Sequence, residues 1–315
     1  MIALDPSEYP RCPVTGEPAT ALVQTVSCAF LARLWEIEFK VDARPSFGGA
    51  SHLSLWRSPT GLMFFSPALI GDASFYNAFY KTLGPKLFPR KDRPRAEFLI
   101  AASYIGAGAR VLDVGCGFGG FRPFVADADY LGLDPHFAGA GRDWSRSESL
   151  AEHLAGNAAA YDAVCAFQVV EHVEKPAELF AEMAAAAKPG GLVIIGVPHA
   201  PSAMARIPNF LLNAPPHHLT WWSEAALRAL AHREGLAVEA VQHVPWSKLD
   251  SLVYWIERCS PVRCRDVYFK HAWSWHASAL TGATLGYVMD KLFGPPKETK
   301  DEGSGLLLVA RKQKG

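Results

Sequence analysis

Hydrophobic residues between about positions 95 and 243 fall into short runs that alternate with segments of helical periodicity. A run of four to eight apolar residues bounded by glycine or proline is typical of a buried strand, whereas apolar positions that recur every three or four residues are typical of a helix. Strands that alternate with helices form βαβ units and a parallel sheet. This part of the chain therefore predicts a doubly wound α/β fold.

The hydrophobic pattern also predicts where the individual elements lie. We expect strands at the apolar runs 110–114, 130–134, 161–167, 192–197, 237–244 and 306–310. We expect helices over 96–105, 176–187 and 224–234. Ser223 is suited to cap the last helix at its start, and Gly235 is suited to end it.

Two segments lie outside this alternation. We expect a small N-terminal module at 1–90 and a main domain at 91–315 that carries an insertion at about 245–304. The insertion is too long for a plain connection, so it is expected to contain helices of its own. Six of the nine tryptophans follow residue 220, where they either wall an apolar substrate pocket or pack this added layer. They are Trp221, Trp222, Trp246, Trp255, Trp273 and Trp275.

The overall charge narrows the choice of partners. Lys plus Arg and Asp plus Glu number 31 each, so no net field favours a nucleic acid or an anionic membrane surface. The N-terminal residues contain no basic region followed by an apolar stretch, and the longest apolar runs are far shorter than a bilayer span. We expect a cytoplasmic protein without a nucleic-acid partner and without stable membrane insertion. The sequence does not indicate an oligomeric state.

A glycine-rich turn follows the strand expected at 110–114. The segment VLDVGCGFGG places Gly115, Gly117 and Gly120 in a GxGxxG spacing, which lets the backbone turn tightly and approach a nucleotide-like ligand. Asp134 ends the next expected strand, 17 residues beyond Gly117, where a carboxylate can accept both hydroxyl groups of a ribose. The loop and this acid fit either NAD or S-adenosylmethionine.

Asp113 helps to separate these two cofactors. It lies at the end of a strand just before the first glycine of the loop, where the pyrophosphate of a dinucleotide would pass. A carboxylate repels phosphate, but it can pair with the α-ammonium group of S-adenosylmethionine. The alternative is that Asp113 caps the turn through neighbouring backbone amides.

Four segments of the chain, in this order, resemble the successive motifs of class I S-adenosylmethionine-dependent methyltransferases. They are VLDVGCGFGG, YLGLDP, YDAVCAFQVVEHVEKP and KPGGLVIIGVP, and they cover residues 95–200. The resemblance implies a Rossmann-like, mostly parallel sheet of seven strands and S-adenosylmethionine as the cofactor. It also implies the cofactor-binding residues: Asp113, Gly115, Cys116 and Gly117 at the methionine part, Asp134 at the ribose, Ser149 and Leu150 at the adenine, and Gln168 and Glu171 facing the cofactor.

Histidines supply the candidate catalytic bases. Glu171 and His172 follow the fourth expected strand, and ligands bind at this end of the strands in open α/β sheets. Farther along lie His199 and the stretch NAPPHHLTWW with His217 and His218, which resembles a substrate-side loop of ubiquinone-biosynthesis-like and sugar-modifying methyltransferases. An imidazole titrates near neutral pH, so any of the four histidines can serve as a general base. Each can instead shape its loop, and Glu171 can instead cap the segment that follows it.

The N-terminal segment resembles a zinc-ribbon-like module that has lost its ligands. Cys12 is followed by Thr15 where a second cysteine would stand, and Arg57 and Thr60 occupy the positions of the second pair. One thiolate cannot make a structural zinc site, so we expect a metal-free module packed by its aromatic residues. The short spacing of Cys259 and Cys264 fits a pair of free thiols, with metal binding as the alternative. We expect no metal site in the chain.

Together these features predict an S-adenosylmethionine-dependent methyltransferase with a small-molecule acceptor. The expected reaction is a direct displacement at the sulfonium methyl group, in which the protein aligns the acceptor and excludes water. Two other interpretations stay open: a protein that retains the cofactor pocket but acts as a scaffold, and an NAD-dependent oxidoreductase.

Overall fold

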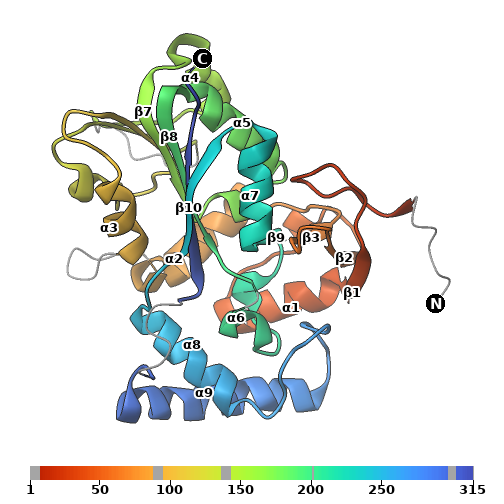
Figure 1. Cartoon of the computed structure of the whole chain (residues 1–315). Helices are drawn as coiled ribbons and strands as arrows, with labels where there is room; N and C mark the ends of the chain where they lie inside the picture. The colour runs from red at the N-terminus through yellow and green to blue at the C-terminus, as the bar shows by residue number, and fades with distance from the viewer. Residues whose placement is uncertain (1–7, 88–94, 136–142, 201, 297–302, 315) are drawn as a thin grey trace.

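The computed structural model describes residues 8–87, 95–135, 143–200, 202–296 and 303–314. Its larger sheet has seven strands in the order β10-β11-β8-β7-β4-β5-β6. The neighbours from β8 to β6 are parallel, whereas β11 runs antiparallel to both β8 and β10. The fold is therefore the doubly wound, mostly parallel seven-stranded sheet that the sequence predicts (Figure 1).

The strands of this sheet agree closely with the apolar runs of the sequence. Their bounds are β4 (Arg110–Val114), β5 (Asp129–Leu133), β6 (Ser145–Arg146), β7 (Tyr161–Phe167), β8 (Ala187–Pro198), β10 (Ala237–His243) and β11 (Gly305–Arg311). The two-residue strand β6 was not among the predicted elements. It consists of two residues that pair with β5, and two residues are too few to show a hydrophobic pattern in the sequence.

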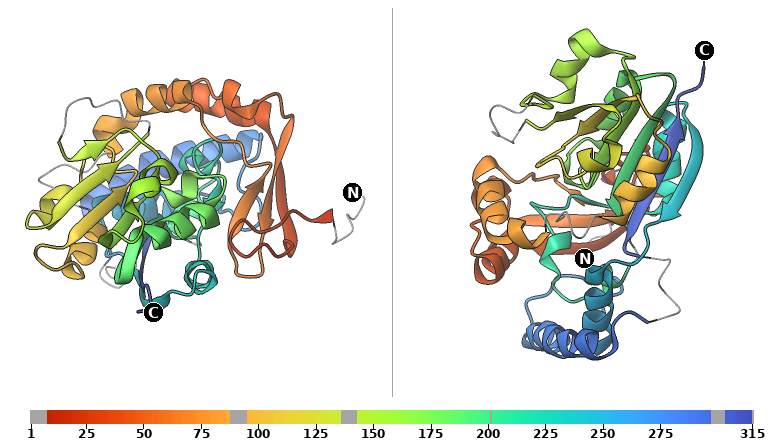
Figure 2. Two further views of the ribbon diagram at one scale, coloured as in Figure 1. Left: turned by 90° about the horizontal axis from the view of Figure 1, so that it is seen from above. Right: turned by 90° about the vertical axis from the view of Figure 1, so that its left-hand side faces the viewer.

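Both faces of the sheet are buried, since alternate side chains of each strand enter different cores. In β7, Val164 and Ala166 belong to the core beneath α5 (Pro176–Ala186) and α7 (Glu224–Arg233), whereas Ala163 and Cys165 belong to the core beneath α3 (Ala96–Ser103). The shorter helix α4 (Leu150–Asn157) packs against α5. Helices therefore cover both faces, as Figure 2 shows.

The N-terminal segment forms a second sheet of four strands in the order β1-β2-β3-β9. The elements of this part are β1 (Ala21–Ser27), α1 (Cys28–Phe39), β2 (His52–Arg57), β3 (Met63–Ser66) and α2 (Ala73–Leu87), completed by β9 (Thr220–Trp221) from the distant loop after β8. Trp56 and Phe64 lie in the same hydrophobic core as Trp222 and Leu227. The N-terminal segment is thus packed onto the main domain, and the domain boundary at residue 90, which lies outside the described residues, stays a prediction.

The turn at Cys12 retains part of the geometry expected of a zinc-ribbon-like loop. The Cys12 sulfur is buried and accepts hydrogen bonds from the backbone N–H groups of Val14 and Thr15, at 3.4 and 3.5 Å. Two backbone donors thus stabilise the sulfur. This arrangement is compatible with the predicted metal-free module.

The insertion contains two helices, as predicted from its length. After the four-residue helix α6 (Ala203–Arg206), the chain forms α7 and β10 and then α8 (Lys248–Cys259) and α9 (Trp273–Phe293). The pair α8 and α9 forms a layer of its own below the main sheet (Figures 1 and 2). None of the helices within the described ranges is both long enough and apolar enough to cross a membrane.

Candidate active site

The glycine loop connects β4 to the end of β5 through backbone hydrogen bonds. The N–H groups of Gly115 and Cys116 both donate to the Leu133 carbonyl, at 2.7 and 3.1 Å, and the Gly117 N–H donates to the Asp134 carboxylate at 3.0 Å. Gly115 has a φ of +70°, and a Cβ there would lie 2.5 Å from the Val169 side chain. The loop therefore requires glycine at this position for both conformational and steric reasons.

A second constrained position in the loop is Gly119, which lies outside the GxGxxG spacing. Its φ is +72°, and a Cβ would meet the Trp144 ring at 2.4 Å. The structure brings Trp144 to the loop from a segment 25 residues farther along the chain. The sequence analysis chose Gly120 as the third glycine because the motif spacing contains no information on this tertiary contact.

Asp113 is buried at the end of β4, where the Tyr130 hydroxyl donates a hydrogen bond of 2.6 Å to it. Burial raises the pKa of Asp113 to about 7; the Tyr130 hydrogen bond opposes this shift, and the negative charge of Asp134 adds to it. A buried carboxylate with a raised pKa is stabilised in its charged form by a nearby cation. Asp113 is thus chemically suited to the α-ammonium group that the sequence analysis assigned to it.

The two residues predicted at the adenine have clear structural roles. The Ser149 hydroxyl accepts from the Glu152 N–H and the Glu152 carboxylate accepts from the Ser149 N–H, so the two residues form a capping box at the start of α4. The Leu150 side chain is buried in the core of the main sheet. A contact of either residue with adenine stays a prediction.

Glu171 is the most unusual buried group of the site. It lies in a short 3-10 turn after β7, is 0% exposed, and neither carboxylate oxygen has a hydrogen-bond partner in the part of the chain that the structure describes. Burial raises its pKa to about 8. Gln168, three residues earlier, has a φ of +58° and donates from its side chain to Glu97 at 3.3 Å. Gln168 thus connects the end of β7 to the start of α3.

Three of the four predicted histidines form one cluster. The rings of His217 and His218 are stacked with centroids 4.6 Å apart, and the His172 ring lies 4.5 and 4.8 Å from them. Burial lowers the pKa of His172 to about 4 and holds the pKa values of His217 and His218 well below their usual range. All three imidazoles are therefore neutral near pH 7.

The hydrogen bonding of His172 defines its reactive nitrogen. Its Nδ1 lies 2.6 Å from the His217 carbonyl oxygen, which can only accept, so Nδ1 carries the proton and Nε2 presents a lone pair. Nε2 is 3.8 Å from a Glu171 carboxylate oxygen. This is the arrangement of a neutral imidazole that can accept a proton beside a carboxyl group.

His199 lies apart from the cluster. Its backbone N–H donates to the Ser304 carbonyl at 2.6 Å, and its ring packs against His243 with centroids 4.8 Å apart. These contacts place it where β8 meets the insertion. The structure therefore gives no geometric support for grouping His199 with the other three histidines.

Two tyrosines of α2, Tyr76 and Tyr80, which the sequence analysis expected among the aromatic residues that pack the N-terminal module and cover the active site, lie next to this cluster. The Tyr76 ring lies 6.5 Å from the His172 ring and 6.3 Å from the His217 ring, and its buried hydroxyl has no hydrogen-bond partner among the described residues. Burial raises the pKa of Tyr80, and the negative charges of Asp134 and Glu171 raise it further. Tyr80 is thus close enough to Asp134 and Glu171 to sense their charges, and α2 brings Tyr76 next to the histidine cluster.

Comparisons with known proteins show the family of the chain. Residues 74–241, more than half of the chain, match a family described as a methyltransferase domain. The chain belongs to this family. It is 27% identical over 198 residues to the ubiquinone biosynthesis O-methyltransferase of Xanthomonas axonopodis pv. citri, a match that covers 55% of this chain and 83% of the relative. The chain is thus a class I methyltransferase, and S-adenosylmethionine is its cofactor, as predicted.

Two of the similar solved structures are described as methyltransferases. A possible histamine N-methyltransferase from Thermotoga maritima is 15% identical, with a TM-score of 0.48, and the match covers 76% of this chain and 98% of that one. An S-adenosylmethionine-dependent methyltransferase from Mesorhizobium loti is 18% identical, with a TM-score of 0.43 and coverages of 69% and 97%. The family match begins at residue 74, inside the segment predicted as an N-terminal module.

The three clustered histidines are also candidates for metal ligands. Within the described ranges they form the group of His, Cys, Asp or Glu side chains whose ligand atoms lie close enough together to be considered. The ligand nitrogens of His172, His217 and His218 lie within 4.8 Å of one another. Nitrogen ligands of a tetrahedral zinc ion are about 3.3 Å apart, given bonds of about 2.0–2.1 Å. The rings would have to move together to hold such an ion.

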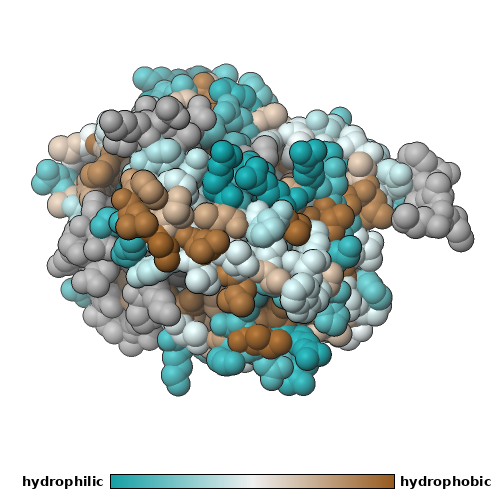
Figure 3. Space-filling model, turned by 90° about the horizontal axis from the view of Figure 1, so that it is seen from below, coloured by the Kyte–Doolittle hydropathy of each residue, from teal (hydrophilic) through white to brown (hydrophobic). Residues whose placement is uncertain are grey.

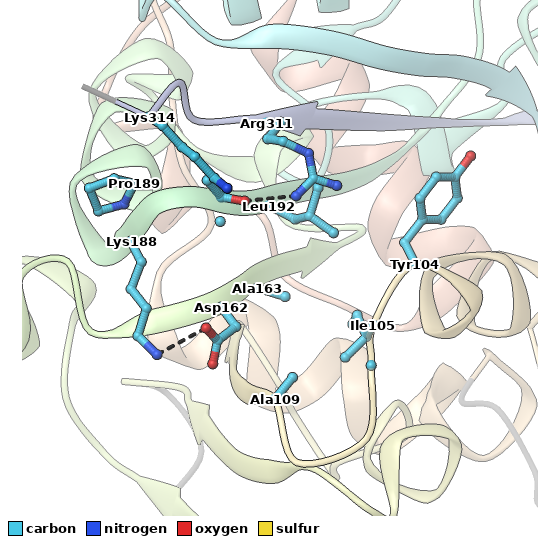
Figure 4. A pocket seen from close by; sticks show the side chains of 13 residues that line it. Tyr104, Ile105, Ala109, Asp162, Ala163, Lys188, Pro189, Leu192, Arg311 and Lys314 are labelled. Atoms are coloured by element: carbon cyan, nitrogen blue, oxygen red, sulfur yellow. Dashed lines mark hydrogen bonds and ion pairs between the residues drawn. The ribbon is translucent and has the colours of Figure 1, made fainter.

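A cavity of about 250 Å³ lies at the amino ends of β7 and β8, the end of the sheet away from the glycine loop. It is lined by the starts of β7 and β8 and the end of β11, where Lys188 pairs with Asp162 and Arg311 donates to the Gly190 carbonyl (Figure 4). Ligands of open α/β sheets bind at the carboxyl ends of the parallel strands, and this cavity lies at the amino ends of β7 and β8. We therefore do not assign the cofactor to it.

Proposed function

We propose that this methyltransferase acts on a hydroxyl group of a small-molecule acceptor that binds between α2 and the turn after β7. One observation carries the proposal: the Tyr76 hydroxyl, both Glu171 carboxylate oxygens and His217 Nδ1 are buried polar atoms without a partner among the described residues. A buried polar group without a hydrogen bond costs about 1–3 kcal/mol. Several such groups next to a cofactor loop indicate a polar ligand that satisfies them.

The surroundings of these polar atoms suit a flat or ring-shaped acceptor. The Phe79 ring packs on His217 with centroids 4.4 Å apart, and Trp35 donates from its indole N–H to the Pro215 carbonyl at 2.9 Å. Aromatic walls with a few convergent polar groups are typical of small-molecule sites. The relative named for ubiquinone biosynthesis and O-methylation supports the same class of acceptor.

His172 is the base that we propose for this reaction. Bound S-adenosylmethionine supplies an electrophilic methyl group. The acceptor oxygen forms the new bond to this carbon as the sulfur–carbon bond breaks, and the hydroxyl proton passes to His172 Nε2. The hydrogen bond from His172 Nδ1 to the His217 carbonyl keeps the ring in the required tautomer. An ionised Glu171, 3.8 Å away, would stabilise the imidazolium that forms.

The test combines cofactor binding with a survey of acceptors. Calorimetry should detect S-adenosylmethionine but not NAD, and Asp134→Ala should weaken that binding. The purified enzyme is then incubated with S-adenosylmethionine carrying a labelled methyl group and with phenols, sugars and primary amines, and the labelled product is identified. We expect O-methylated product, and we expect His172→Gln to bind the cofactor normally but to lose about 10²–10⁴-fold in turnover. An N-methylated product, or full turnover in His172→Gln, would refute this proposal.

A further inference from the structure

Helix α9 packs against the protein through its small residues. Apart from Trp275, its buried positions are Ser278, Gly282 and Gly286, at intervals of four residues. Gly282 and Gly286 face α8, and the Ser278 hydroxyl accepts a hydrogen bond from the Val262 N–H. A Cβ on Gly282 would lie 2.8 Å from the Ile256 carbonyl oxygen, and one on Gly286 would lie 2.6 Å from the Ile256 backbone nitrogen. The two helices therefore approach each other closely along a stripe of small residues, and the large side chains of α9 cannot lie in this interface.

The large apolar side chains of α9 point into solvent instead. Trp273 is 83% exposed and Leu280 is 70% exposed. The full set of exposed large hydrophobic residues on this helix is Trp273, Leu280, Leu285, Tyr287, Val288, Leu292 and Phe293. Figure 3, which views the molecule from the side where α8 and α9 lie in Figure 1, shows hydrophobic residues gathered on this face. These apolar side chains, with the exposed Thr284 and Lys291 among them, occupy much of the exposed side of α9, and an exposed group of large apolar residues marks an interaction surface.

The acidic groups around α9 are engaged within the protein. Glu257 is buried and pairs with Arg206 at 3.2 Å, and Asp266 pairs with Arg57 at 2.9 Å. Asp290 accepts a hydrogen bond from the Ser251 hydroxyl. Asp250 accepts hydrogen bonds from the backbone N–H groups of Ser247 and Ser304. Arginines therefore offset the charges of Glu257 and Asp266, whereas Asp250 and Asp290 keep their charge and are held by hydrogen bonds to neutral donors.

Most basic groups of the same segment are exposed and have no acidic partner. Arg263 lies 3.6 Å from Glu257. The other basic side chains from residue 248 to 291 form no ion pair with any residue that the structure describes. They are Lys248, Arg258, Arg265, Lys270 and Lys291. Segment 248–291 thus contains six basic and four acidic side chains, a net charge of +2, although the whole chain has no net charge.

We propose that α9 lies flat on an anionic lipid bilayer, with its apolar side chains in the boundary between headgroups and acyl chains. A helix of 21 residues is about 32 Å long and can lie in the interface without crossing it. Basic side chains beside an apolar helix face complement anionic headgroups. A second copy of the chain is a poorer partner, because the isologous contact would bring two sets of positive charge together.

The proposal is tested by sedimentation of the full-length protein with vesicles. The vesicles contain equal parts of phosphatidylcholine and phosphatidylglycerol, or phosphatidylcholine alone. We expect binding to the anionic vesicles, at least tenfold weaker binding to neutral ones, and loss of at least tenfold in affinity in the double variant Leu280→Asp/Leu292→Asp. The matched control, Ile37→Asp/Leu99→Asp, changes exposed leucine-sized residues on α1 and α3 and should bind like the unmodified protein.

Two further measurements keep the outcome clear. Calorimetry with S-adenosylmethionine should give the same affinity for both double variants, which establishes that they fold. Sedimentation velocity without lipid should give the same monomer-sized species for the unmodified protein and for Leu280→Asp/Leu292→Asp. Absence of vesicle binding, equal loss in the control variant, or a dimer that only the α9 variant dissociates would each overturn the proposal.

Discussion

Glu171→Gln is expected to make the protein more stable while it lowers activity. The carboxyl group of Glu171 is completely buried and neither oxygen has a hydrogen-bond partner among the described residues, so the folded protein strongly favours its neutral form. In the unfolded chain the same group is ionised at neutral pH. Folding must therefore bind a proton there, and an amide of nearly the same shape removes this requirement.

The magnitude follows from the shifted pKa. Burial raises the pKa of Glu171 from 4.5 to about 8, so its stabilising protonation is fully present below pH 4.5 and is lost as the pH rises through about 8. One pKa unit corresponds to about 1.4 kcal/mol. Between pH 5.5 and 7.5 the unmodified protein should therefore lose about 2–3 kcal/mol in unfolding free energy relative to Glu171→Gln. The amide can also change the unfolding free energy in ways that do not depend on pH. Such effects are the same at both pH values and drop out when the two unfolding free energies are subtracted.

The assay is urea unfolding followed by circular dichroism at both pH values. The control is Glu178→Gln, because the Glu178 side chain is 66% exposed and the substitution should show almost no dependence of stability on pH. A pH-independent difference between Glu171→Gln and the unmodified protein would refute the reasoning. It would mean that water or a rearranged partner stabilises the ionised carboxylate in the folded state.

Three further predictions concern the same region. Gly115→Ala should abolish measurable S-adenosylmethionine binding by calorimetry, because the new Cβ would lie 2.5 Å from Val169 on a backbone with a φ of +70°. The rate of methyl transfer should rise as the pH passes about 8 and the Glu171 carboxylate forms, and Glu171→Gln should remove this rise from the pH–rate profile. Ser223→Ala should lower the unfolding free energy in urea by about 1–2 kcal/mol, since the Ser223 hydroxyl caps α7 and also donates to the Thr60 carbonyl.

The core of the fold could be predicted because its signal is local. The strands β4, β7, β8 and β11 are buried on both faces along most of their length, and such a strand appears in the sequence as one apolar run. The N-terminal sheet could not be predicted in the same way. Its fourth strand, β9, is contributed by residues 220–221, and a ladder across such a distance leaves no periodicity in either segment.

The proposed cofactor-binding residues could also be predicted because they lie close together in the sequence. The proposed acceptor-binding residues could not, because they come from distant segments. Gly115, Gly117 and Asp134 lie within 20 residues of one another, and their spacing is a motif. The acceptor half brings together Tyr76 and His217, which are more than 140 residues apart. Four histidines could be proposed from their residue type alone, but only the fold could separate His199 from the other three.

Helix α9 indicates why hydrophobic patterning must be combined with side-chain size. The tryptophans after residue 220 were expected either to wall a pocket or to pack an added layer, and Trp221, Trp222 and Trp275 do lie in buried positions. Trp273 does neither: it is 83% exposed at the start of α9, whose side toward α8 carries Gly282 and Gly286. In a helix that contains glycines at intervals of four residues, the small face can be the buried one, and the large apolar residues then belong to a surface for binding.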